Sequence, residues 1–155
     1  MAFIFPAPGV AGVQATLNIS VVGDSANLVV PAMQNITVNN ANDVMTWTQL
    51  DSGSKLQVAT TATNSLDLNL VLDQTTFFGT GTGTPVAINK GIFGLSKDKQ
   101  LVEFQLYLGD TSAGGAGKTL GGFGYITGLA PTVSADSPVW VSPVTLTISG
   151  DYTVT

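Results

Sequence analysis

Hydrophobic and polar residues alternate along several segments of the chain with the two-residue period that is typical of half-buried β-strands. Near the C-terminal end, Val144, Leu146 and Ile148 share one face, and the residues between them are Thr and Ser. This strand follows a short apolar strand and a polar turn within residues 121–150. The same alternation predicts further strands in residues 13–22, 65–73 and 100–108. The leucines at positions 66, 68, 70 and 72 give the cleanest pattern, so we expect the core to lie beneath them.

Residues 43–60 predict a long hairpin around the turn Asp51-Ser52-Gly53-Ser54. In the first strand Met45 and Trp47 share a face, and in the second Leu56 and Val58 lie together. Neither face of this hairpin is strongly apolar by sequence. A two-stranded hairpin of this kind is marginal alone, so it needs neighbouring strands.

One helix is expected, over residues 85–96. Thr84 can serve as its N-cap and Pro85 as its first residue, and Ile88, Ile92 and Leu95 then fall on one face. Gly91 and Gly94 weaken it. The sequence also predicts an extended arm at 1–12 and about seven or eight strands. Together these elements predict that residues 1–155 form a single mainly-β domain. Its expected fold class is an antiparallel β-sandwich or barrel with one short flanking α-helix.

The composition favours an assembly component. Charged residues make up 10% of the chain and hydrophobic residues 44%. These charges are too few to cover a typical monomer, so other subunits are expected to cover part of the surface. The net charge is −5, there is no arginine, and the lysines stand at positions 55, 90, 97, 99 and 118. Unclustered cations argue against conventional DNA binding, although an acidic protein can surround DNA without holding it.

Residues with catalytic chemistry are scarce. The chain has no cysteine and no histidine, which excludes disulfides, zinc–thiolate sites and histidine acid–base catalysis. We therefore expect no cofactor, no metal and no enzymatic activity. Gly117-Lys118-Thr119 resembles the end of a phosphate-binding loop, but Ser112 stands where that motif requires glycine.

Two further patterns fail as candidate sites. Asp67 and Asp73 lie on the same predicted strand about 20 Å apart, too far for a glycosidase carboxylate pair. Trp47 and Trp140 are expected to pack against the core or a neighbouring subunit. A carbohydrate-stacking platform is the less favoured interpretation, because it needs several aromatic residues in one groove. The first residues contain neither a basic group nor a long apolar run, so neither a secretory signal nor a membrane anchor is expected.

Two segments carry a resemblance to a known family. Phe123-Gly124-Tyr125-Ile126-Thr127-Gly128-Leu129, a small polar turn and the alternating strand ending in Ser149-Gly150 together resemble the C-terminal hairpin of tail tube (major tail) proteins of long-tailed bacteriophages. Residues 43–54, which read Asp-Val-Met-Thr-Trp-Thr-Gln-Leu-Asp-Ser-Gly-Ser, are similar to the segment with which that family enters its long hairpin.

The resemblance implies a β-sandwich whose copies close into hexameric rings, with the hairpins joined around a lumen through which viral DNA passes. It implies partners as well: further copies of the chain, tail tip and terminator proteins and a tape-measure protein, in a virion tail made in the host cytoplasm, without a membrane. The candidate lumen and inter-subunit residues are Asp43, Met45, Thr46, Trp47, Thr48, Gln49, Asp51, Lys55 and Gln57. The arm at 1–12 and the loop at 74–84 are the candidate ring-stacking segments, through Phe3, Phe5, Phe77 and Phe78.

Other classes of function remain open. The tube of a contractile tail or of a secretion system shares the tail tube fold. A capsid decoration protein, a fibre protein or an adhesin would share the β-rich, cysteine-free character, but would carry aromatic residues in its loops. The loops at 79–84 and 111–118 carry none, which counts against a binding module.

Overall fold

The computed structural model describes residues 16–24, 27–30, 33–48, 50, 53–60, 63–81, 87–109 and 117–155. Its elements are β1 (Thr16–Val21), β2 (Leu28–Val30), β3 (Met33–Asn39), β4 (Asp43–Thr48), β5 (Lys55–Thr60), β6 (Ser65–Val71), α1 (Gln74–Phe78), α2 (Ala87–Lys97), β7 (Val102–Leu108), β8 (Lys118–Leu129), β9 (Thr132–Ser134), β10 (Ser137–Ile148) and β11 (Thr153–Val154). This architecture confirms the predicted mainly-β class.

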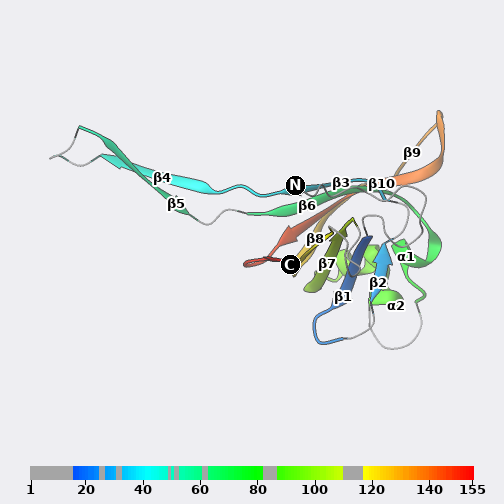
Figure 1. Cartoon of the computed structure of the whole chain (residues 1–155). Helices are drawn as coiled ribbons and strands as arrows, with labels where there is room; N and C mark the ends of the chain where they lie inside the picture. Colours follow the sequence, from blue (N-terminus) through cyan, green and yellow to red (C-terminus); the bar gives the residue numbers. More distant parts are fainter. Residues whose placement is uncertain are drawn as a thin grey trace.

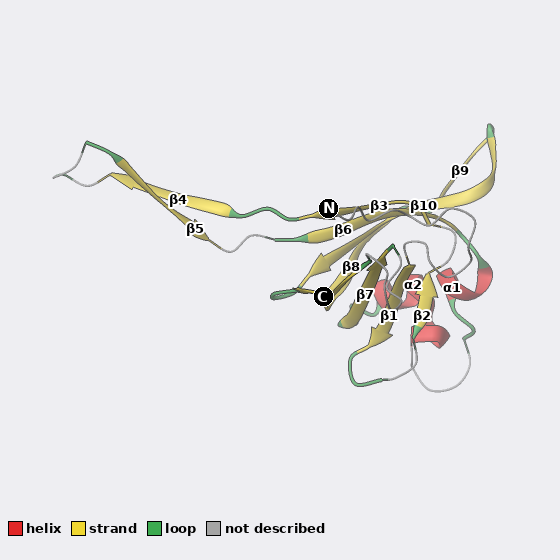
Figure 2. Ribbon diagram, viewed as in Figure 1, coloured by secondary structure: helices red, strands yellow, loops and turns green. Residues whose placement is uncertain are grey.

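One antiparallel sheet forms the body of the molecule, with the strand order β2-β1-β7-β8-β10-β6-β3. Short β9 pairs with β10, and β11 pairs with β8. The sheet twists strongly, so that β3 and β6 run across the view whereas β1 and β2 run down it (Figure 1). Both helices lie beside the β1–β2 edge, and α2 also contacts β8 (Figure 2). The helices therefore close one side of the core that the curved sheet partly encloses.

The core side chains come from the alternating positions. In β6, Leu66, Leu68 and Leu70 are buried while the residues between them are half-buried. The predicted inward faces of β1, β7 and β10 are confirmed in the same way. Residues of β2, β8 and the helices complete the core, to which these three strands contribute Leu17, Ile19, Val102, Phe104, Leu106, Val144, Leu146 and Ile148. Alternation predicts burial well here because each strand has one face toward the core and one toward solvent.

The helical region differs from the prediction in two respects. A second short helix, α1, occupies part of the segment expected to be a loop. Within α2 the backbone leaves the helical conformation at Gly91 (φ 65°, ψ 177°), which kinks it. Ile88 lies before this kink and is exposed, whereas Ile92 and Leu95 lie after it and are buried. The expected single face of three apolar residues is therefore wrong at Ile88, because the break at Gly91 interrupts the helical period and Ala87 takes the buried position in the first part of α2.

The β3–β6 pair continues outward as the β4–β5 pair. Asn39 is opposite Ser65 at the end of the body sheet, and Asp43 is opposite Thr60 where the outer hairpin begins. Between the two pairs, the Ala41 amide donates a hydrogen bond to Asn64 Oδ1 (3.1 Å). Beyond this break the β4–β5 hairpin projects well away from the body (Figure 1). Among the described residues, its strands contact each other extensively and have no extensive contact with any other helix or strand.

Candidate subunit interface

The register of the projecting hairpin gives its two faces different chemistry. Directly opposed residues of an antiparallel pair lie on the same face. Met45 is opposite Val58 and Trp47 is opposite Leu56, so one face carries four large apolar side chains. The other face carries the pairs Thr46–Gln57 and Thr48–Lys55, with Val44–Ala59 near the base. The hairpin is therefore amphipathic across its two faces.

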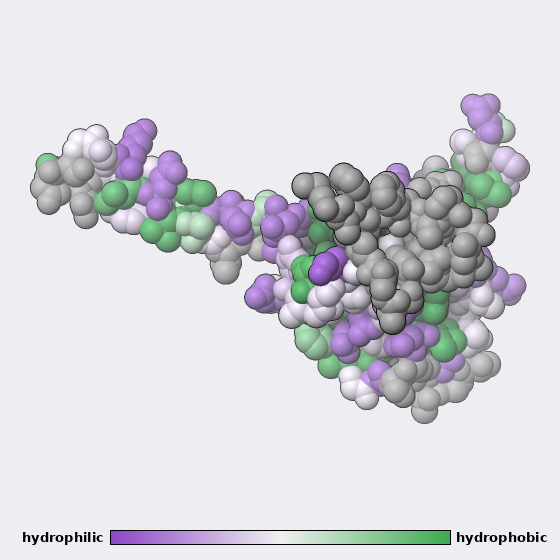
Figure 3. Space-filling view, viewed as in Figure 1, coloured by the Kyte–Doolittle hydropathy of each residue, from purple (hydrophilic) through white to green (hydrophobic). Residues whose placement is uncertain are grey.

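The expectation that neither face is strongly apolar is wrong. Taken strand by strand, each half contributes two apolar residues, and only the register shows that they face the same way. Met45, Trp47 and Val58 are exposed and Leu56 is half-buried. Figure 3 shows hydrophobic and hydrophilic residues side by side along this projection. Exposed apolar clusters of this kind usually mark sites of contact with another molecule.

The predicted lumen residues divide between these faces. Met45 and Trp47 belong to the apolar face, and Asp43 lies on the same side at its base. Thr46, Thr48, Lys55 and Gln57 belong to the polar face. Gln49 and Asp51 lie outside the described residues, as do Phe3, Phe5 and the arm at 1–12.

Phe77 and Phe78, both predicted to contact a neighbouring ring, have opposite environments. Phe77 is fully buried, while Phe78 is 53% exposed. Their rings meet edge to face with centroids 4.9 Å apart, and the Phe78 ring also lies 5.8 Å from that of Phe93. Phe77 thus anchors α1 in the core, which leaves Phe78 as the member of the pair that is accessible to a partner.

Asp73 sets the position of α1. Its carboxylate Oδ1 accepts hydrogen bonds from the Thr76 amide (3.0 Å) and the Phe77 amide (3.2 Å). Its Oδ2 accepts from the hydroxyls of Thr75 (3.1 Å) and Thr76 (3.0 Å). These bonds satisfy amide groups that the first turn of a helix leaves free. Residues 65–73 predicted a strand that includes Asp73, and the place of Asp73 just before Gln74-Thr75-Thr76 was the N-cap signal that could have revealed α1.

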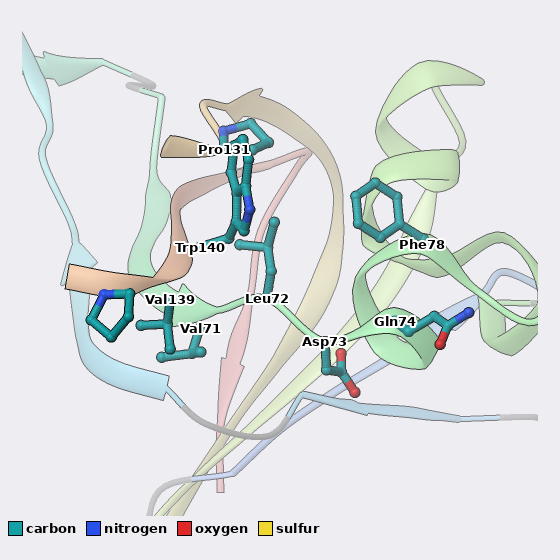
Figure 4. A pocket seen from close by; sticks show the side chains of 9 residues that line it. Val71, Leu72, Asp73, Gln74, Phe78, Pro131, Val139 and Trp140 are labelled. Atoms are coloured by element: carbon teal, nitrogen blue, oxygen red, sulfur yellow. The ribbon is translucent and has the colours of Figure 1, made fainter. Parts of the chain in front are cut away.

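An apolar groove lies between α1, the end of β6 and the β9–β10 region (Figure 4). Its volume is about 500 Å³, and its main walls are formed by Leu72, Phe78, Pro131, Val139 and Trp140. Trp140 is 52% exposed, and its backbone carbonyl accepts a hydrogen bond from the Leu72 amide (2.9 Å). Sequence reasoning missed this groove because its walls come from segments about sixty residues apart. Trp47 lies on the distant hairpin, so the two tryptophans do not share a groove.

The remaining candidate sites have structural roles. Lys118 and Thr119 open strand β8, so Gly117-Lys118-Thr119 lacks the strand-to-helix setting of a phosphate loop. Asp67 accepts a hydrogen bond from Asn39 Nδ2, while Asp73 caps α1. Within the described segments, no group of three or more potential metal ligands comes together. None of the helices described is long and apolar enough to cross a membrane.

Comparison with known proteins gives matches in structure and none in sequence. No protein-family model matches the chain, and no curated protein sequence matches it. A chain from the tail of an empty gene transfer agent particle with C6 symmetry aligns with a TM-score of 0.64 and 12% identity, over 90% of this chain and 94% of that one. A chain from the six-fold symmetrised anti-feeding prophage baseplate aligns with a TM-score of 0.57 and 13% identity, over 97% of each chain.

A third match comes from the extended sheath–tube complex of the PVC extracellular contractile injection system. It has a TM-score of 0.52 and 13% identity, over 90% of this chain and 87% of that one. At such low identity the shared feature is the fold, and the alignments span nearly the whole of each chain. The chain has a phage tail-tube-like fold, as the resemblance in its sequence predicts.

Proposed function

We propose that this chain is a structural subunit of a tail tube, in which copies close into hexameric rings that stack around a lumen for the passage of DNA. The observation that carries the proposal is the amphipathic β4–β5 hairpin, which projects from the body with its apolar face uncovered. An isolated two-stranded hairpin is marginally stable in water. Packing of Met45, Trp47, Leu56 and Val58 against a neighbouring copy would remove both that instability and the exposed apolar surface.

The polar face is suited to line a channel. Thr46, Thr48 and Gln57 are neutral hydrogen-bonding side chains, and Lys55 is the sole cation in residues 43–60. DNA affinity rises with the number of phosphates that clustered cations neutralise. A lumen lined mainly by neutral groups would hydrate well and would let DNA pass without retaining it.

The proposed contact is of a kind that can close into a ring. The hairpin of one copy and the body of the next are different surfaces, so their contact is heterologous and generates a ring if the rotation closes. Six-fold closure is supported by the C6 symmetry of the gene transfer agent tail and the six-fold symmetry of the anti-feeding prophage baseplate. We place the chain in the tail of a virion or related particle, made in the host cytoplasm, with no enzymatic role. The tube of a contractile injection system is the neighbouring alternative, supported by the PVC match.

The same comparisons support partners at the ends of the tube. Matched chains occur in the anti-feeding prophage cap, which terminates its tube, and in the PVC sheath/tube terminator. We therefore propose terminator and tail tip proteins as partners at the two ends of the tube, with a tape-measure protein inside it. Contacts with further copies of the chain provide the rest of the assembly.

Adjacent hairpin positions allow a matched test. Val58 and Gln57 are neighbours in β5 but lie on the apolar and the polar face. In a tube, Val58→Asp would bury a charge in the subunit contact, whereas Gln57→Asp would place the same charge in the lumen. Both sites are exposed in the isolated chain, so the folding stability of each variant should stay within about 0.5 kcal/mol of the wild type. Electron microscopy of concentrated protein should show rings or tubes for the wild type and for Gln57→Asp, and dispersed subunits for Val58→Asp.

Two outcomes would contradict the proposal. The first is a wild-type chain that remains monomeric at high concentration and is also absent from the tail of its particle. The second is unchanged assembly of Val58→Asp, which would show that the apolar face is not at a subunit contact.

A further inference from the structure

The groove beside Trp140 is a second uncovered apolar surface, separate from the hairpin. Its walls come from α1, the end of β6 and the β9–β10 region (Figure 4). Figure 1 shows α1 and β9 at the end of the molecule opposite to the β4–β5 projection. Trp140 and Phe78 each remain about half exposed there, beside Pro131 and Pro138. We propose that this groove binds residues 3–8 of a second copy, the segment Phe-Ile-Phe-Pro-Ala-Pro. The proposal rests on the tube function, because it assigns the surface through which stacked copies meet.

The size of the groove suits a single extended segment. Its volume of about 500 Å³ is within the range of sites that hold a few side chains. A two-stranded hairpin presents a ribbon at least ~5 Å wide between strand axes, with side chains on both faces, and is poorly matched to such a space. An extended segment inserts its side chains one after another and needs only a narrow channel.

The chemistry of the segment matches the walls of the groove. Residues 3–8 carry two phenylalanines, two prolines and no charged side chain. Prolines favour an extended polyproline II conformation, which loses little conformational entropy on binding. Grooves lined by aromatic residues are the usual binding sites of such segments. Trp140 and Phe78 supply aromatic walls, and the nearest carboxylate, that of Asp73, is occupied in capping α1.

A tether of seven residues joins the segment to the body. Residues 9–15 separate the segment from β1, which begins at Thr16. Seven residues can span up to about 25 Å when extended. A segment that binds the next copy leaves one free segment and one free groove at the ends of every stack, so the contact propagates as a tube requires. A segment bound to the groove of its own copy would leave nothing to bind the next copy, and stacking would stop there.

Photo-crosslinking of the full chain tests the assignment. Phe5 is replaced by p-benzoylphenylalanine, and equal amounts of ¹⁵N-labelled and unlabelled protein are assembled together and irradiated. Cleavage at the lysines separates the two walls of the groove, which lie in peptides 56–90 and 119–155, from the peptide that carries position 5. We expect crosslinks that join one labelled and one unlabelled copy, from position 5 to peptide 56–90 or 119–155. Crosslinks confined to a single copy, or directed to other peptides, would overturn the proposal.

A pair of valines provides the matched control. Val139 lines the groove and is 43% exposed, whereas Val133 lies in β9, is not among the lining residues and is 44% exposed. Val139→Asp should lower the yield of the intermolecular crosslink about tenfold or more, because it places an unpaired charge in an apolar contact. Val133→Asp should leave the yield unchanged, and equal loss in both variants would count against the groove.

The two proposals can fail separately. Tubes whose position-5 crosslinks lie elsewhere would remove the groove assignment and leave the tube function standing. A chain that does not associate at any concentration, and is absent from the tail of its particle, would remove both.

Discussion

Gly79 and Gly91 pack backbone against backbone where α1 meets α2. Both have a positive φ, 80° and 65°. A Cβ atom on Gly91 would collide with the Gly79 amide nitrogen and the Phe77 carbonyl oxygen, and one on Gly79 would collide with the Asn89 carbonyl oxygen. Two hydrogen bonds flank the contact, from the Thr80 amide to the Ile88 carbonyl (3.2 Å) and from the Gly81 amide to the Asn89 carbonyl (3.0 Å). This contact fixes α1, and with it the position of Phe78 at the groove.

Gly91→Ala should therefore destabilise the fold by more than the cost of an alanine at positive φ, which is about 1–2 kcal/mol. The added methyl group has no room, because its neighbours are backbone atoms. Gly23→Ala is the matched control, since Gly23 has φ 88° but open space around it. Chemical denaturation should give a larger loss for Gly91→Ala than for Gly23→Ala. Equal losses would show that the helices separate easily at this contact.

Leu68 tests the core. It is buried at the centre of β6, opposite Ile36 of β3 and Val144 of β10. Leu68→Ala should lower the free energy of unfolding by about 2–5 kcal/mol through lost burial and a residual cavity. Leu50→Ala removes the same atoms from a fully exposed leucine and should change it by less than about 0.5 kcal/mol. Similar thermal midpoints for both variants would contradict the assignment of the core.

Deletion of residues 45–58 should separate folding from assembly. The described β4 and β5 have no extensive contact with other helices or strands, so the remaining sheet should keep its circular dichroism spectrum and its cooperative unfolding. In the proposed tube the same deletion removes the residues that line the lumen and contact the next copy. Sedimentation should then show folded monomers. A deletion variant that still forms tubes would place the lumen elsewhere.

The chain should not bind duplex DNA measurably at physiological salt. It has five lysines and no arginine, with a net charge of −5. Counterion release, which supplies most non-specific affinity, needs several cations close together. Fluorescence anisotropy with labelled duplex, repeated across salt concentrations, measures this directly. A micromolar affinity with a steep salt dependence would contradict a lumen that lets DNA pass freely.

The strands were predictable because their signal is local. The alternation of apolar and polar residues in β1, β6, β7 and β10 is visible within each strand alone, and the apolar face of each strand is the one that packs in the core. The kink in α2 was not predictable in the same way. The two glycines in the helix indicated weakness, but the break at Gly91 depends on the approach of Gly79, twelve residues earlier. Tertiary packing decided the backbone there, and with it the exposure of Ile88.

The arrangement of the candidate interface residues was predictable only in part for the same reason. The sequence placed Met45 with Trp47 and Leu56 with Val58, but the pairing register alone shows that these two sets share a face. Phe77 and Phe78 are adjacent in sequence, and the capped helix α1 buries one and exposes the other. The groove needed Leu72 and Trp140 to meet, and only the alignment of the end of β6 with β10 brings them together.

The separation of the β4–β5 hairpin from the core has an evolutionary consequence. Most substitutions in a core are limited by the small stability margin of a folded domain. Side chains of the hairpin that pack on no other described element are released from that limit. The polar face can therefore drift or adapt, for example in charge or bulk, while the fold is inherited unchanged. In the proposed tube, single mutations of this kind would give the lumen a new inner surface, and each of them would leave a foldable protein.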